Sequence, residues 1–324
     1  MEKIKHSVIV ITYNQEHLLP TALDSLFRQS VLPYEVIIGD DCSTDGTWDV
    51  IQEYYKKYPD IVRPIRNQHN MGIFQNLNYL KKKPTGDVVS FLSGDDWYED
   101  GIFEAFNDAI AENHIDIKKD NFLLISNCIF QYPDGRRVVY DNTPFKGKDL
   151  FKVRIRYGLD FRDTGMSLNL VKQLDDIPLN LGYYADWLHA IGQIYKASDI
   201  YFINKAFSVY RKGYGVTSVA KRQSLLNSKI KVINRIKELY EKELDKNDLI
   251  SLEYDSEISK LLLFRNDTSF YFLIRNYNKI VSDDLLSEQQ RKNIRCMLWC
   301  GIRNYFLKKM HLYDMLKSLK ERIK

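Results

Sequence analysis

The first hundred residues repeat one pattern four times, and this repetition constrains the fold more than any other feature of the chain. Short β-branched apolar runs occupy residues 7–12, 35–39, 61–65 and 87–92, and an amphipathic stretch follows each of them. Apolar runs of this length are typical of buried strands, and the stretches between them carry apolar residues at helical spacing. The alternation predicts an α/β fold with a mostly parallel sheet that is flanked by helices.

Polar side chains follow three of these predicted strands. They are Thr12, Tyr13 and Asn14 after the first strand, Asp40 and Asp41 after the second, and Asp95 and Asp96 after the fourth. Open α/β sheets bind ligands at the carboxyl ends of their strands. These polar residues are therefore the candidates for a binding site.

The adjacent carboxylates of Asp95 and Asp96 form a hard-oxygen site, which suits Mg²⁺ or Mn²⁺ bound together with substrate phosphates. The alternative is a turn and helix cap before a helix over residues 101–112, which is the commoner role of acids at loop starts.

Asp41 can accept hydrogen bonds from a base or a ribose, or it can cap the next helix. Tyr13 can stack on a base or pack in the core. No Gly-x-Gly-x-x-Gly or Walker sequence follows the first strand, which excludes the usual dinucleotide and P-loop sites.

After residue 120 the pattern changes. The pattern predicts a hairpin formed by residues 122–132 and 136–140, which Pro133-Asp134-Gly135 joins. It also predicts a helix over residues 184–195 and two strands over residues 200–204 and 206–210. From residue 218 onward the chain reads as helical. We therefore expect an α/β domain over 1–216 and a helical region over 217–324, with the boundary near residue 216.

Charge is unevenly distributed along the chain. Residues 291–324 carry ten Lys or Arg and two acids, which leaves 37 bases and 41 acids elsewhere out of totals of 47 and 43. This distribution excludes a global nucleic-acid-binding charge but leaves a local basic tail with apolar residues at helical spacing. The tail predicts either docking on an anionic membrane surface or an ordinary basic subdomain.

The four cysteines predict neither a disulfide framework nor a zinc site, and no run of 18 apolar residues is present. The apolar run at the N-terminus is too short for a signal peptide. We expect a cytoplasmic protein, peripheral on the inner face of the cell membrane if the tail docks there.

Five motifs occur in an order that resembles family 2 of the inverting glycosyltransferases, which have the GT-A fold. They are Ile11-Thr12-Tyr13-Asn14, Asp40-Asp41-x-Ser43-x-Asp45-Gly46-Thr47, Asn70-Met71-Gly72, Ser93-Gly94-Asp95-Asp96 and Ala185-Asp186-Trp187. The resemblance extends over about residues 6–218. It implies that residues 1–216 form a GT-A catalytic domain, with a nucleotide-sugar-binding half at about 1–97 and an acceptor half at about 98–216. Each motif alone is weakly specific, whereas the ordered set is specific.

The resemblance implies a nucleoside-diphosphate-sugar donor, UDP- or dTDP-linked, and a glycan or lipid-linked glycan acceptor, as in the synthesis of bacterial capsule, O-antigen or exopolysaccharide. The residues that it places at the nucleotide are Thr12, Tyr13, Asn14, Asp41, Asp45 and Asp95. Asp96 would hold Mn²⁺ or Mg²⁺, which neutralises the leaving diphosphate. Asp186 would be the catalytic base that takes the proton of the acceptor hydroxyl.

One position departs from the family. Gly213 stands where the family often carries a His, in the segment from Tyr210 to Tyr214. Arg211, Lys212 and Tyr214 are the candidates to hold the diphosphate instead. Because of this departure, one alternative interpretation is that the chain is a catalytically inactive family member that serves as a binding subunit. A sugar nucleotidyltransferase is a further alternative, although residues 14–17 do not form the glycine-rich basic loop that such enzymes use.

Overall fold

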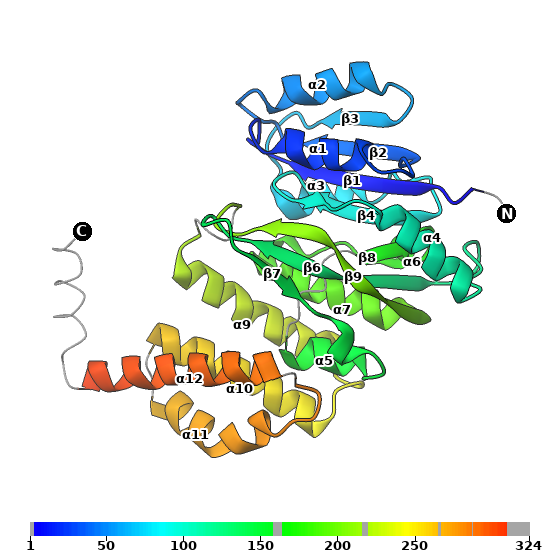
Figure 1. Cartoon of the computed structure of the whole chain (residues 1–324). Coiled ribbons are helices and arrows are strands. Elements are labelled where there is room, and N and C mark those ends of the chain that lie inside the picture. Colours follow the sequence, from blue (N-terminus) through cyan, green and yellow to red (C-terminus); the bar gives the residue numbers. More distant parts are fainter. Residues whose placement is uncertain (1–2, 158–163, 216–219, 265–266, 287, 310–324) are drawn as a thin grey trace. The chain divides into compact units, whose positions relative to one another are not determined.

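The computed structural model describes residues 3–157, 164–215, 220–264, 267–286 and 288–309 (Figure 1). Contacts divide the chain into two compact units. Unit 1 comprises residues 1–146, 160–179 and 189–219, and unit 2 comprises residues 147–159, 180–188 and 220–324. The segments 147–159 and 180–188 thus cluster with the C-terminal helices, although they precede residue 216 in the sequence.

Unit 1 begins with four parallel strands in the order β3-β2-β1-β4. They are β1 (His6–Thr12), β2 (Glu35–Asp40), β3 (Val62–Arg66) and β4 (Val88–Ser93), and the helices that follow them are α1 (Leu19–Phe27), α2 (Thr47–Lys57), α3 (Ile73–Leu80) and α4 (Ile102–Glu112). Nearly every residue of β1 and β2 is buried, as strands covered on both faces require. The predicted β–α alternation is confirmed, and the strands differ from the prediction by one residue at their ends.

The same sheet continues beyond β4 in the order β8-β6-β9-β5, and β7 pairs with β6. These strands are β5 (Trp97–Tyr98), β6 (Phe122–Gln131), β7 (Arg137–Tyr140), β8 (Thr164–Ser167) and β9 (Asp199–Arg211). Strand β8 is antiparallel to β4 and β6, and β5 is antiparallel to β9, so this part of the sheet is mixed. The hairpin of β6 and β7 is confirmed, as is the α/β fold class.

One prediction of secondary structure is wrong in this part of the chain, and several short elements were not predicted. The two strands expected at 200–204 and 206–210 form one strand, β9, because its pairing with β6 continues across register shifts at Ser126, Asn127 and Cys128. Strand β8 and the short helices α6 (Leu168–Gln173), η1 (Thr143–Phe145) and η2 (Leu179–Leu181) lack a sequence pattern long enough to predict them.

Unit 2 is helical. Its elements are α5 (Leu150–Tyr157), the start of α7 (Ala185–Lys196), α9 (Arg222–Leu239), α10 (Lys246–Phe264), α11 (Asp267–Val281) and α12 (Glu288–Lys309). Apolar residues of α10, α11 and α12, among them Leu261, Leu273 and Leu298, form its core. The predicted helical C-terminal region is confirmed as far as residue 309, and residues 310–324 lie outside the described part. No helix in the described ranges is both long and apolar enough to cross a bilayer.

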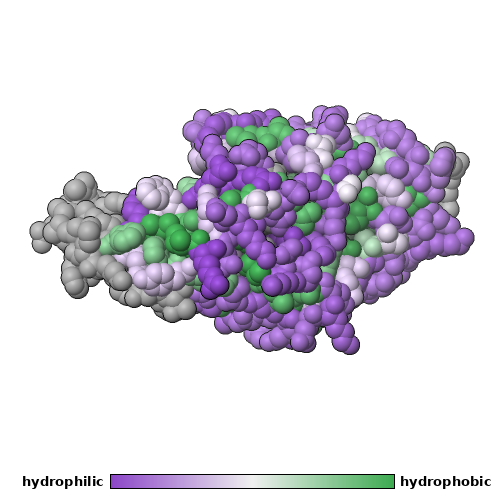
Figure 2. Space-filling view, turned by 90° about the horizontal axis from the view of Figure 1, so that it is seen from below, coloured by the Kyte–Doolittle hydropathy of each residue, from purple (hydrophilic) through white to green (hydrophobic). Residues whose placement is uncertain are grey.

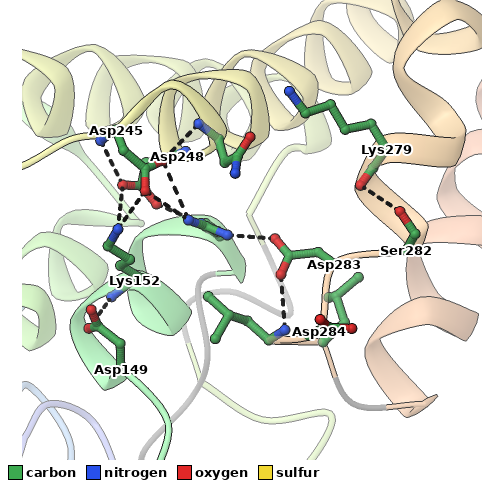
Figure 3. Close-up of polar contacts among 12 residues, drawn as sticks. Asp149, Lys152, Asp245, Asp248, Lys279, Ser282, Asp283 and Asp284 are labelled. Atoms are coloured by element: carbon green, nitrogen blue, oxygen red, sulfur yellow. Dashed lines mark hydrogen bonds and ion pairs between the residues drawn. The ribbon is translucent and has the colours of Figure 1, made fainter.

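Figure 3 shows an ion cluster that joins α5 to α10. Nε of Arg156, a buried side chain of α5, lies 2.5 Å from Oδ1 of Asp248, and its Nη1 lies 2.7 Å from Oδ2 of Asp283. Asp248 and Asp245 cap the start of α10 reciprocally, since the backbone N–H of each donates to the carboxylate of the other at 2.9 Å. Nζ of Lys152 lies 2.5 Å from Oδ2 of Asp245. The cluster therefore fixes α5 against the capped end of α10.

Candidate active site

The loops that follow β1 and β2 interlock at the carboxyl edge of the sheet. Asn14 has a left-handed backbone, with φ of 51°, and its N–H donates to Oγ of Ser43 at 2.9 Å. In return, the N–H of Thr44 donates to Oδ1 of Asn14 at 2.8 Å. The predicted nucleotide-site residues of both loops are therefore brought together, and the neighbouring Tyr13 leaves its ring exposed beside them.

Asp45 binds the first turn of α2. Its carboxylate accepts hydrogen bonds from the N–H and Oγ1 of Thr47, at 3.0 and 2.6 Å, and from the N–H of Glu16 at 3.2 Å. Partial burial opposes ionisation, but the Thr47 hydrogen bonds outweigh it and hold the pKa of Asp45 below its ordinary value. In this arrangement Asp45 shapes the loop as a helix cap does, and its place at the nucleotide remains a prediction.

Asp41 is buried and binds the loop after β3. Oδ1 accepts from Nδ2 of Asn67 at 2.9 Å and from the N–H of Met71 at 2.8 Å, and Oδ2 accepts from the N–H of Gly72 at 2.7 Å. A carboxylate offers about four acceptor positions, so one more donor can be accommodated at Oδ2. The Asn70-Met71-Gly72 segment orients Asp41, because the backbone N–H groups of Met71 and Gly72 donate to its carboxylate.

Arg66, at the end of β3, is a site residue that the sequence analysis missed. Its Nε lies 3.2 Å from Oδ2 of the fully buried Asp40, its Nη2 donates to the carbonyl of Ser43 at 3.0 Å, and its guanidinium lies over the Trp48 ring at 5.3 Å. The signal available was its position directly after a predicted strand. Arg66 and Asp40 thus stabilise the loop that carries Asp41.

The acidic pair lies where β4 turns into β5. Oδ1 of Asp95 accepts from Oγ of Ser93 at 2.5 Å, and Oδ1 of Asp96 accepts from the N–H of Arg211 at 2.8 Å. Nε of Arg211 also donates to the backbone carbonyl of Asp95 at 2.9 Å. Both acids are buried. The antiparallel pairing of β5 with β9 produces this contact, because it places Trp97 opposite Val209 and so brings the end of β9 beside the acids.

Of the three candidate diphosphate residues, Arg211 and Tyr214 lie together, whereas the Lys212 side chain contacts other rings. The Arg211 guanidinium lies over the rings of Trp97 and Tyr214, at 4.8 and 5.6 Å. Nζ of Lys212 lies over the rings of Phe130 and Tyr210 instead, at 4.1 and 4.4 Å. Arg211 therefore directly contacts the segment of the acidic pair.

Glycine is required where the chain passes this pair. Gly215 has φ of +77°, and a Cβ at this position would lie 3.0 Å from Oδ2 of Asp95. Gly213 has φ of +85°, and its Cβ would lie 3.1 Å from Cγ of Pro133. Left-handed backbone disfavours residues with a Cβ, so a His is strained at position 213 with this backbone.

Asp186 lies in unit 2, in the first turn of α7, where its side chain is exposed. Its Oδ1 accepts from the N–H of Trp187 at 2.9 Å, and the buried Trp187 donates from Nε1 to the carbonyl of Arg154 at 2.8 Å. This anchoring of Trp187 fixes the helix start that carries Asp186. Its assignment as the base remains a prediction.

The donor set at Asp95 and Asp96 fits a hard divalent ion. In the described part of the chain, no group of three or more His, Cys, Asp or Glu side chains is placed to hold a metal by itself. Mg²⁺ in phosphate sites takes one or two carboxylates and completes its shell with water and substrate phosphates. Asp95 and Asp96 would therefore match the protein's share of such a site.

Comparison with known proteins agrees with the motifs. The family model described as glycosyl transferase family 2 matches residues 7–177. A curated GalNAc(5)-diNAcBac-PP-undecaprenol beta-1,3-glucosyltransferase of Campylobacter jejuni is 27% identical over 64% of this chain and 64% of its own length. The chain spans 58% of the length of its uncharacterized mycobacterial relatives.

Solved structures share the fold. Residues 1–349 of S. aureus TarS, in complex with UDP-GlcNAc, align over 95% of this chain and 92% of that chain with a TM-score of 0.64 and 21% identity. The mannosyltransferase PcManGT of Pyrobaculum calidifontis, in complex with GDP-Man and Mn²⁺, covers 95% of this chain and 89% of that chain with a TM-score of 0.51 and 16% identity. The GT-A fold and the resemblance stated from the sequence are confirmed.

Proposed function

The chain belongs to glycosyl transferase family 2, and we propose that it transfers a sugar from a UDP- or dTDP-linked donor to a hydroxyl group of a glycan or lipid-linked glycan. The observation that carries this proposal is the contact of the Asp95-Asp96 segment with Arg211 at the carboxyl edge of the sheet. Two carboxylates beside a guanidinium provide both a cation-binding and a phosphate-binding group.

The interlocked loops after β1 and β2 support the nucleotide half of the proposal. Hydrogen bonds from the backbone N–H of each loop to a side chain of the other hold the two loops together beside the exposed Tyr13 ring. Asp41 is oriented by backbone N–H groups and keeps acceptor capacity on Oδ2 for a donor N–H of the base. The complex of TarS with UDP-GlcNAc, on the same fold, is consistent with this class of ligand.

The leaving diphosphate is the second element of the proposal. Arg211 donates to its oxygens through the guanidinium nitrogens that do not bond to Asp95, and the Trp97 and Tyr214 rings hold the guanidinium plane. A divalent ion held by Asp96, when bound, neutralises charge on the diphosphate. The complex of PcManGT with GDP-Man and Mn²⁺ is consistent with metal use on this fold.

Asp186 is proposed as the general base. The acceptor oxygen forms a bond to the anomeric carbon while the bond from that carbon to the diphosphate oxygen breaks, and the hydroxyl proton passes to the Asp186 carboxylate. One displacement without a covalent intermediate inverts the anomeric carbon, as in inverting glycoside hydrolysis with an acceptor in place of water. Asp186 is an exposed residue in the first turn of α7.

For the pathway, we propose bacterial surface-polysaccharide synthesis on the cytoplasmic side of the membrane. The Campylobacter relative is named for an undecaprenol-linked glycan acceptor, and a Bacillus subtilis relative, 29% identical over 43% of this chain, is named for teichuronic acid biosynthesis. The first name is that of an enzyme acting on a lipid-linked glycan, and the second is that of an enzyme for a polysaccharide.

The test is a screen of the purified chain against nucleotide sugars with Mn²⁺ or Mg²⁺ that measures release of nucleoside diphosphate. Asp96→Asn should lower metal-stimulated release about 100-fold or more, because several kcal/mol of charge stabilisation depend on the bound ion. Asp100→Asn is the matched control, since Asp100 is 73% exposed four residues later and pairs with Arg28. The control should retain wild-type release.

Three outcomes contradict the proposal. Release that is unaffected by both EDTA and Asp96→Asn refutes the role of the acidic pair. Nucleotide binding without turnover on any donor indicates an inactive binding subunit. Consumption of added pyrophosphate with release of nucleoside triphosphate and sugar 1-phosphate, in place of nucleoside diphosphate, indicates a sugar nucleotidyltransferase.

A further inference from the structure

Helix α12 exposes aromatic and basic side chains on one face. Its buried residues recur at helical spacing and face the core of unit 2, namely Gln290, Ile294, Leu298, Gly301 and Tyr305. On the opposite side, within about 100° of arc at 100° per residue, lie Lys292, Arg295, Cys296, Trp299, Arg303 and Phe306, all exposed. We call these six residues the α12 outer face.

The exposure on this face is large for apolar rings. Trp299 is 70% exposed and Phe306 is 49% exposed. Phe306 lies 5.7 Å from the Phe270 ring at the start of α11, and the adjacent Tyr271 is 66% exposed. Ring contacts of Phe270 with Phe306 and with Tyr271 therefore link the aromatic residues of α12 to those of α11. Figure 2 shows the molecule from below, with green hydrophobic residues among the hydrophilic ones at its surface. Contiguous exposed apolar surface of this kind marks interaction sites.

The charges on the α12 outer face indicate which kind of partner it binds. The α12 outer face carries three cations, and the one acid of α12 that lies in the same arc is Glu288, at the start of the helix and 4.0 Å from Arg295. Arg291 does not contribute, because its guanidinium donates to the backbone carbonyls of Asp283 and Leu286 at 2.9 and 3.4 Å. Exposed aromatic rings between cations match the boundary of an anionic bilayer, where the rings insert at the headgroup level and the bases contact lipid phosphates.

We propose that the α12 outer face, together with Tyr271 of α11, docks this protein on an anionic lipid bilayer. The inference goes beyond the proposed transferase function and does not depend on it, because it rests on unit 2 alone. Docking at a bilayer would give the transferase direct access to acceptors that carry a lipid.

The experiment measures partitioning of the full chain onto vesicles by flotation. Vesicles of equal parts phosphatidylglycerol and phosphatidylcholine should bind the protein, whereas vesicles of phosphatidylcholine alone should bind it weakly. Each Lys or Arg near an anionic surface contributes about 1 kcal/mol, which is about fivefold in the partition coefficient. Lys292→Gln/Arg295→Gln/Arg303→Gln should therefore lower partitioning about 100-fold.

A charge-matched control separates the face from net charge. Lys56→Gln/Lys57→Gln/Lys83→Gln removes the same charge from exposed lysines of unit 1 and should bind as the wild type does. Trp299 reports insertion directly, because its fluorescence should shift to the blue on anionic vesicles and Trp299→Phe should lose that shift. Asp96→Ala should float normally, so that loss of transfer and loss of docking are distinguishable.

Several results would overturn the proposal. One such result is equal flotation of the wild type on the two vesicle types. Another is an equal loss of vesicle binding in the α12 triple variant and in the unit 1 triple variant. A third is a dimer in sedimentation that Trp299→Ser abolishes while no vesicle binds the chain, since this outcome assigns the face to a second copy.

Discussion

Replacing Arg156 tests whether the ion cluster of unit 2 stabilises the fold. The Arg156→Met variant removes the guanidinium but keeps most of the apolar stem volume. It leaves the carboxylate of Asp248, which is 0% exposed, without its partner at 2.5 Å. Breaking a buried pair in this way costs about 3–5 kcal/mol, because one charge remains buried and uncompensated.

The remaining contacts place the cost toward the lower end of that range. Oδ2 of Asp248 still accepts from the Asp245 N–H at 2.9 Å, and Nζ of Lys152 lies 4.0 Å away. We therefore expect Arg156→Met to lower the free energy of unfolding in urea by about 3 kcal/mol. Adding Asp248→Asn should recover part of the loss, because the second substitution removes the orphaned charge.

The matched control is Arg235→Met, which breaks an exposed pair with Glu238 in α9. Exposed pairs of this kind contribute about 0.2–1 kcal/mol. The reasoning fails if Arg156→Met costs no more than Arg235→Met, or if the double variant is less stable than Arg156→Met alone.

Three further predictions concern the base, a buried histidine and the departure from the family motif. Asp186→Asn should lower turnover about 10²–10⁴-fold while nucleotide binding, measured by calorimetry, persists; turnover at the wild-type rate would refute the assignment. Burial beside Phe103 lowers the pKa of His6 from 6.5 to about 4, so its contribution to stability is present above pH 6.5 and is lost as the pH falls toward 4. Urea titrations at several pH values should show a shallower decline for His6→Gln, and identical slopes would contradict the prediction. Gly213→His should lower stability by about 1–2 kcal/mol, and Gly213→Asn by less, because Asn tolerates left-handed backbone; equal stability of Gly213→His and wild type would show that the turn relaxes.

The loops after β1, β2 and β4 show what the sequence motifs could predict and what they could not. The motifs located the acids because each follows a strand whose apolar run is visible locally. They did not distinguish a ligand from a cap, and the structure shows Asp45 bonded to the first turn of α2 and Asp41 bonded to the segment of Met71 and Gly72. A carboxylate after a strand looks the same in both roles, since the donors that bind it come from other segments.

The sequence by itself determined the β–α alternation, the order of the motifs and hence the family, because these depend on local periodicity and on short-range spacing. Only the tertiary structure selected Arg211 over Lys212 beside Asp95 and Asp96 and joined residues 147–159 to the C-terminal helices. The two-residue strand β5 pairs with β9 more than one hundred residues later. Such a pairing leaves no periodic trace, since its free energy comes from hydrogen bonds and packing between distant segments rather than from the preferences of either one.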